Sequence, residues 1–271
     1  MHRAILIAPV LVLLATVSAW ADARMNVLVD VLKLDEAATI LSEEGMAQAA
    51  NLNTEMLDGQ GGAGWAMQIE SIYAPALMVE RVREELEQEL SPDAVEEVIA
   101  FYATEIGSQI IELENAARRA IQDPDVEEAA RSRFVELEGS DDPRLALITR
   151  YVEDGDMVAR NVTSAMNSNY QFLRGLVDGD GIEMSEEDIL KDAAGDVGES
   201  TVDTTQWLYG YLLLAYFPLE IEDLEAYVAF SDSEAGQALN RALFRGFGKA
   251  YEDISYALGR AVALNMTAKD L

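Results

Sequence analysis

The chain reads Leu90-Ser-Pro-Asp-Ala-Val-Glu-Glu-Val-Ile-Ala-Phe-Tyr-Ala-Thr-Glu-Ile-Gly107, and it repeats this pattern as Leu219-Glu-Ile-Glu-Asp-Leu-Glu-Ala-Tyr-Val-Ala-Phe-Ser-Asp-Ser-Glu-Ala-Gly236. Leu, Glu, Ala, Phe, Glu and Gly recur at the same positions of the two stretches. Upstream, Met56–Gly61 and Leu176–Gly181 each combine a helix end with a glycine turn. Self-similarity at a long spacing is typical of repeated structural units. We therefore predict two tandem, related multi-helix units, residues 22–140 and residues 141–271.

The repeated stretch predicts a tight corner between two helices. In each copy an apolar helical stripe ends at a phenylalanine. Thr104 and Ser233 then supply the hydroxyl of a helix N-cap, and the glutamate that follows each of them suits the helix dipole. A glycine three residues after the cap leaves room for the close approach of a neighbouring helix. The residues that define the corner are Phe101, Tyr102 and Gly107 in the first copy and Phe230, Gly236 and Gln237 in the second.

Helical periodicity extends over most of the chain. Between Arg144 and Val177, apolar residues recur every three or four positions, which predicts one long amphipathic helix. Gly155 lies between two aspartates, so a helical hairpin at 153–156 is the alternative. Strand-like alternation is scarce, and we predict an all-α fold in which the two units pack as a bundle-like array. Further helices are expected at 27–56, 65–90, 94–121, 126–137, 204–217 and, with breaks, 221–264.

The first 21 residues have the pattern of a secretory signal peptide. A basic tip precedes an apolar run from Ala4 to Val17, and Ala19 and Ala21 provide the small residues that a signal peptidase requires. We expect a mature protein that begins at Asp22 and is periplasmic or secreted by a bacterium. The other strongly apolar stretch, 207–217, is too short to cross a bilayer, so we expect no membrane span after removal of the signal.

Composition excludes several classes of function. The chain has 50 acidic and 19 basic residues and a net charge of −31, so it would be repelled by nucleic acid. It has no cysteine, and its one histidine, His2, lies in the predicted signal peptide. The mature protein would therefore form no disulfide, no thiol nucleophile, no Cys or His zinc site and no histidine base. Because 50% of the residues are hydrophobic, we expect a folded core.

The stretch Leu90–Ile110 resembles the core motif of a bacterial secreted family known as domain of unknown function 2059. The motif has an acidic helix, then Phe-Tyr, two variable residues and Gly-Gln. The first copy has Phe101-Tyr102 but Ser108 in place of the Gln, and the second has Gly236-Gln237 but Ser231 in place of the Tyr. The resemblance implies an exported, all-helical envelope protein in two divergent copies. It implies no catalytic residue, because the activity of the family is unknown.

An acidic loop follows the glycine turn of the second unit. Residues 178–188 resemble a calcium loop, in which carboxylates at alternate positions surround the cation, and the candidate ligands are Asp178, Asp180 and Glu187. The loop register is poor, because the first ligand position would fall on Leu176. The alternative is a solvated turn followed by the acidic start of a helix at Ser185.

A positive stripe stands out on this acidic chain. Arg241, Arg245 and Lys249 lie four residues apart on one predicted helix face. They are candidates for an anion-binding or partner-docking strip. Alternatively, they neutralise acidic helices that pack beside them.

These observations favour a binding or protein-interaction module that has no cofactor and no catalytic residue. The partner would be an unknown protein or small ligand of the cell envelope, and we expect the site in a groove between the two units, because ligand sites favour such interfaces. Two alternatives remain open. One is a carboxylate-dependent hydrolase, which needs two acids with displaced pKa values in a cleft. The other is a calcium-responsive envelope protein.

Overall fold

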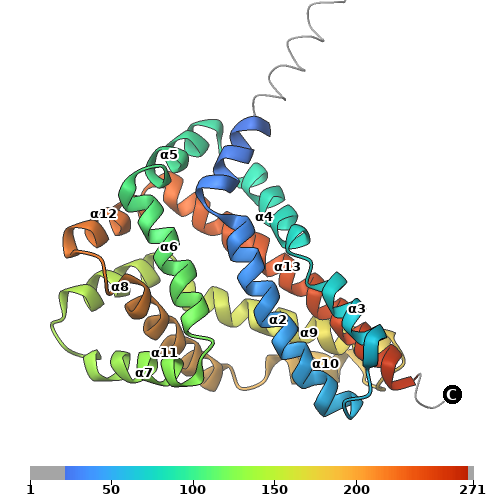
Figure 1. The fold of residues 1–271 in the computed structure, drawn as a ribbon. Coiled ribbons are helices and arrows are strands. Elements are labelled where there is room, and N and C mark those ends of the chain that lie inside the picture. Colours follow the sequence, from blue (N-terminus) through green and yellow to red (C-terminus); the bar gives the residue numbers. More distant parts are fainter. Residues whose placement is uncertain (1–21, 268–271) are drawn as a thin grey trace, which may run out of the picture.

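A computed structural model describes residues 22–267, and within this range every regular element is an α-helix, which confirms the predicted all-α fold. The predicted signal peptide, residues 1–21, lies outside the described residues. No helix between residues 22 and 267 combines the length and the hydropathy needed to cross a bilayer. A first helix covers residues 22–31, and the helices labelled in Figure 1 are α2 (Leu34–Leu57), α3 (Gly62–Ile72), α4 (Pro75–Glu89), α5 (Pro92–Tyr102), α6 (Glu105–Ala120), α7 (Pro124–Leu137), α8 (Pro143–Asp154), α9 (Met157–Asp178), α10 (Glu186–Ala194), α11 (Val197–Tyr216), α12 (Ile221–Ser231) and α13 (Glu234–Thr267).

Helix α13 runs through the middle of the molecule (Figure 1). It packs along α9 on one side and α4 on another. The contact with α9 is so close that a methyl group on Gly259 would lie 2.1 Å from the Phe172 carbonyl oxygen. Two buried apolar clusters result, one around α5, α6, α11 and α12 and one around α3, α10 and the C-terminal half of α13.

The same order of elements occurs twice along the chain. A short helix (22–31 or α8) ends at a residue with a left-handed backbone, Lys33 with φ 48° or Asp156 with φ 51°. A long helix follows (α2 or α9), then a short one (α3 or α10), then α4 or α11, α5 or α12, and α6 or α13. The packing between the two halves follows the same equivalence. Helix α13 of the second half packs on α4 of the first, and its equivalent α6 packs on α11, the equivalent of α4. The division into units 22–140 and 141–271 stays a prediction, and this shared order supports it.

The single long helix expected at 144–177 is wrong, and the break at 153–156 is correct. Helix α8 ends at Asp154, and α9 begins at Met157. Asp156 has φ 51° and ψ 36°, a left-handed conformation that aspartate tolerates but that interrupts an α-helix. The expected helix at 65–90 is also divided, because Pro75 begins α4 and disfavours helical geometry at the residue before it.

The two predicted corners are built alike. The Thr104 side chain accepts a hydrogen bond from the Gly107 N–H at 3.0 Å, and the Ser233 side chain accepts one from the Gly236 N–H at 3.1 Å. Both glycines lie against the end of the preceding helix. A Cβ atom on either would be 2.3 Å from a main-chain carbonyl oxygen, that of Phe101 in the first corner and of Phe230 in the second. Only glycine fits here without displacing the backbone.

We predict that Gly107→Ala and Gly236→Ala each lower the free energy of unfolding by about 2–3 kcal/mol, because the clash is with backbone that cannot move aside. Urea unfolding followed by circular dichroism measures this loss. Gly64→Ala in α3 is the matched control, since a Cβ at Gly64 meets no atom within 4 Å. It should instead stabilise the helix by up to about 0.5–1 kcal/mol. Similar effects for all three variants would contradict the packing of the corners.

Candidate functional site

The two corners meet at a stacked pair of phenylalanine rings. The ring centroids of Phe101 and Phe230 are 4.0 Å apart and the ring planes are 5° from parallel. The Tyr102 ring packs edge-on against Phe230 with centroids 5.7 Å apart. Residues that the sequence singled out in separate copies are therefore in direct contact. The remaining corner residue, Gln237, donates a hydrogen bond to the Asp154 carbonyl and so links α13 to the end of α8.

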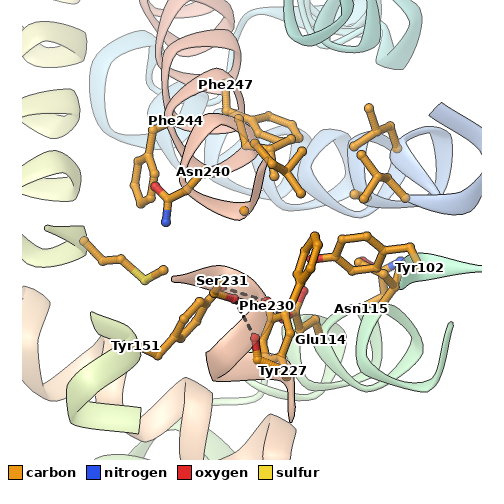
Figure 2. A pocket seen from close by; sticks show the side chains of 18 residues that line it. Tyr102, Glu114, Asn115, Tyr151, Tyr227, Phe230, Ser231, Asn240, Phe244 and Phe247 are labelled. Carbon is orange, nitrogen blue, oxygen red and sulfur yellow. Dashed lines mark hydrogen bonds between the residues drawn. The ribbon is translucent and has the colours of Figure 1, made fainter. Parts of the chain in front are cut away.

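A cavity of about 180 Å³ lies beside this stack, between the two halves of the chain. Figure 2 shows Asn240, Phe244 and Phe247 on one side of it and Tyr102, Glu114 and Tyr227 on the other. Its walls are mostly apolar and aromatic. The lining residues with polar side chains are Tyr102, Glu114, Asn115, Tyr151, Tyr227, Ser231 and Asn240.

Glu114 of α6 is the centre of a tyrosine cluster. Its Oε1 accepts hydrogen bonds from the hydroxyl groups of Tyr216, at 2.5 Å, and Tyr227, at 3.1 Å. Tyr151 and Tyr227 share a hydrogen bond between their hydroxyl groups at 2.8 Å, and the Tyr211 hydroxyl donates to the main-chain carbonyl of Glu114. The cluster therefore joins α6 of the first half to α8, α11 and α12 of the second.

Burial changes the acidity of this cluster. It raises the pKa of Glu114 above its ordinary value, although the hydrogen bonds from Tyr216 and Tyr227 act in the opposite direction. Burial, with the nearby Glu114 carboxyl, also holds the pKa values of Tyr216 and Tyr227 well above the usual value for tyrosine. A carboxyl group in this setting keeps its proton to a higher pH than an exposed one. The remaining titratable groups of the cluster are Tyr102, Tyr151 and Tyr211.

Two amide groups at the cavity have hydrogen-bonding atoms without a protein partner. These atoms are the Nδ2 donor of Asn115, whose residue is only 8% exposed, and the Oδ1 acceptor of Asn240. A buried polar group without a partner costs about 1–3 kcal/mol, and such groups are rare in folded proteins. Because both residues line the same cavity, it is the candidate site.

A wider groove of about 590 Å³ lies between α2 and α9, which is also a junction between the two halves. Its charged lining residues neutralise each other. Arg118 donates to both carboxylate oxygens of Glu44, at 2.7 and 2.6 Å, and its guanidinium stacks over the Trp207 ring. The cavity beside the corners is the stronger candidate, because two of its amide groups each have an atom without a partner.

The predicted positive stripe faces α4. Arg241 and Arg245 form ion pairs with Glu89 at 2.5 and 2.7 Å, and Lys249 forms one with Glu85. This is the arrangement of the alternative interpretation, in which the cations neutralise a neighbouring acidic helix. These ion pairs lower the pKa of Glu89, chiefly through the hydrogen bond from Arg241. A docking role for the stripe stays a prediction.

The three candidate calcium ligands lie around the turn between α9 and α10. Asp178 accepts a hydrogen bond from the Tyr256 hydroxyl at 2.9 Å, and its carbonyl accepts one from Arg260. Asp180 occupies a left-handed position in the turn, and Glu187 is in the first turn of α10, which Ser185 caps. Among the described residues, no group of three or more His, Cys, Asp or Glu side chains is arranged to hold a metal ion. Calcium binding here stays a prediction.

The sequence analysis missed Glu114, Asn115 and Asn240. Glu114 follows the buried Ile110 by one helical turn and precedes the buried Ala117, so an acid stands on the apolar face of α6. An acidic residue on an apolar helix face was the signal in the sequence that could have identified Glu114. With 50 acidic residues in the chain, that signal is difficult to recognise before the fold is known.

We predict that Glu114→Gln removes a pH dependence from stability. The unfolded chain loses the Glu114 proton near pH 4.5, whereas the folded protein keeps it to a higher pH because the pKa is raised. Glu114 therefore destabilises the fold progressively as the pH rises from 4.5 through the pKa of the folded state. The melting temperature of the variant, relative to the wild type, should therefore increase over that range. Glu112→Gln on the same helix is the control: Lys33 lowers the pKa of Glu112, so the relative shift should have the opposite sign and should occur below pH 4.5 rather than above it. A flat difference for Glu114→Gln would contradict the burial of its carboxyl.

We predict unequal effects within the positive stripe. Lys249→Ala leaves Glu85, whose side chain is only 4% exposed, without its cation and should cost about 1–3 kcal/mol of stability in urea unfolding. Arg245→Ala should cost less than about 1 kcal/mol, since its side chain is exposed and Glu89 keeps Arg241. Losses near zero for both variants would argue against neutralisation as the role of the stripe.

The first corner lies in a segment that matches a known family model. Residues 77–134 match the family model described as "Uncharacterized protein conserved in bacteria (DUF2059)", which confirms the resemblance seen at Leu90–Ile110. The matched segment runs from α4 to α7 and includes Glu114 and Asn115. No curated protein and no solved structure matches the chain. Over this segment the chain is similar to the bacterial family DUF2059.

Proposed function

We propose that this chain is a non-catalytic binding protein of the bacterial envelope that holds a small ligand in the cavity beside the two corners. One observation carries the proposal: the Asn115 donor and the Asn240 acceptor lie at the cavity with no protein partner. A ligand with a donor or an acceptor could pair with one of these two amides. It would also recover the free energy that the burial of that amide costs the empty protein.

The size of the cavity limits the ligand. A volume of about 180 Å³ is slightly larger than the cavity of about 150 Å³ that binds benzene in an engineered lysozyme. The ligand would therefore be about as large as a substituted six-membered ring. Mostly apolar walls with a few placed polar groups are typical of small-molecule sites.

Binding has better support than hydrolysis. Glycoside hydrolysis by carboxylates needs two acids on either side of the bond that breaks. Among the residues that line this cavity, Glu114 is the single carboxylic acid. The groups that hydrogen-bond to its carboxyl are the phenols of Tyr216 and Tyr227, whose raised pKa values make them poor bases near neutral pH.

The envelope location rests on the sequence. Residues 1–21 have the charge, apolar run and small residues of a signal peptide, and the matched family is bacterial. The absence of cysteine from the chain fits a protein that folds without regard to the redox state of its compartment.

We predict that 2-pyrrolidinone, a ring with one N–H donor and one carbonyl acceptor, raises the melting temperature of the mature protein, because a ligand stabilises the state that it binds. Ala37→Leu should abolish the shift, since Ala37 lines the cavity and a larger side chain would fill it. Differential scanning fluorimetry at millimolar ligand measures the effect.

Ala47→Leu is the matched control on the same helix, because Ala47 is exposed and outside the cavity. It should keep the wild-type shift. An equal shift in Ala37→Leu would reveal a general solvent effect, and no shift in the wild type would contradict ligand binding by the cavity.

A further inference from the structure

We infer that the ligand of the cavity is a compact organic ammonium ion. This inference rests on the proposed function and adds the chemical class of the ligand. Two features of the cavity support it: a set of aromatic rings and one carboxyl group.

Aromatic rings from four helices line the cavity, and we call them the aromatic cage. Helices α5 and α8 each contribute one tyrosine, α12 contributes a tyrosine and a phenylalanine, and α13 contributes two phenylalanines. The faces of such rings attract cations, and cages of this kind recognise quaternary ammonium groups. The members of the cage are Tyr102, Tyr151, Tyr227, Phe230, Phe244 and Phe247.

Glu114 supplies the opposite charge. Both of the hydrogen bonds to its carboxyl reach Oε1, from Tyr216 and Tyr227. Among the described residues no hydrogen bond reaches Oε2, so this oxygen remains available to a ligand. A cation beside the carboxyl would favour its ionised form and offset the cost of burying the charge. The two phenol donors already solvate that charge from the other side.

The charge of the whole protein also favours a cation. The net charge of −31 also attracts cations to the protein surface and so favours their encounter with the site.

The probe is choline, and its neutral counterpart is 3,3-dimethyl-1-butanol, in which carbon replaces the charged nitrogen. We expect isothermal titration calorimetry to show choline binding at least about tenfold more tightly to the mature protein, the scale of a desolvated cation–π contact. Glu114→Gln should reduce this preference by about tenfold. Phe247→Leu, which keeps an apolar wall but removes one ring, should weaken choline and leave the neutral alcohol nearly unchanged.

The outcomes separate the inference from the proposed function. Equal binding of choline and the neutral alcohol, unchanged in Glu114→Gln, would overturn the ammonium inference but keep the cavity as a ligand site. Failure of choline, the alcohol and 2-pyrrolidinone alike would overturn both. If Glu114→Gln does not fold, Phe247→Leu alone decides: an unchanged preference for choline in that variant would contradict the role of the aromatic cage.

Discussion

The stacked rings of Phe101 and Phe230 hold the two halves of the chain together at one point, and the rest of the architecture follows from it. Each ring ends a short helix, and the next helix starts so close behind it that its third residue has room only for glycine. Helices α6 and α13 leave the stack from these corners and cross to the opposite half, α6 onto α11 and α13 onto α4. The cavity lies beside the stack, and residues of both α6 and α13 line it (Figure 2).

The polar centre depends on this crossing. Glu114 comes from the first half, whereas its partners Tyr216 and Tyr227 come from the second, so the hydrogen bonds form only when both halves are packed. A buried acid, an unpaired amide donor and an unpaired amide acceptor all lower the stability of an empty protein. Proteins tolerate such departures from good packing mainly at functional sites. This cost is the reason that we place the candidate site at the cavity.

Much of the fold could be predicted from the sequence, because its signals are local. The repeated stretch, the caps at Thr104 and Ser233, and the helical periodicity each depend on a few neighbouring residues. The break at Asp156 was harder, since a left-handed aspartate leaves no mark beyond the adjacent glycine. The centre of the candidate site could not be predicted. Glu114 resembles any other acid on an acidic chain, and its partners lie far from it in the sequence.

A high-resolution crystal structure of the mature protein, soaked with choline, tests the account most directly. We expect density for the trimethylammonium group among the six rings of the aromatic cage. Its charge should face Glu114. Ordered water alone in the cavity, or side chains that close it, would contradict the account.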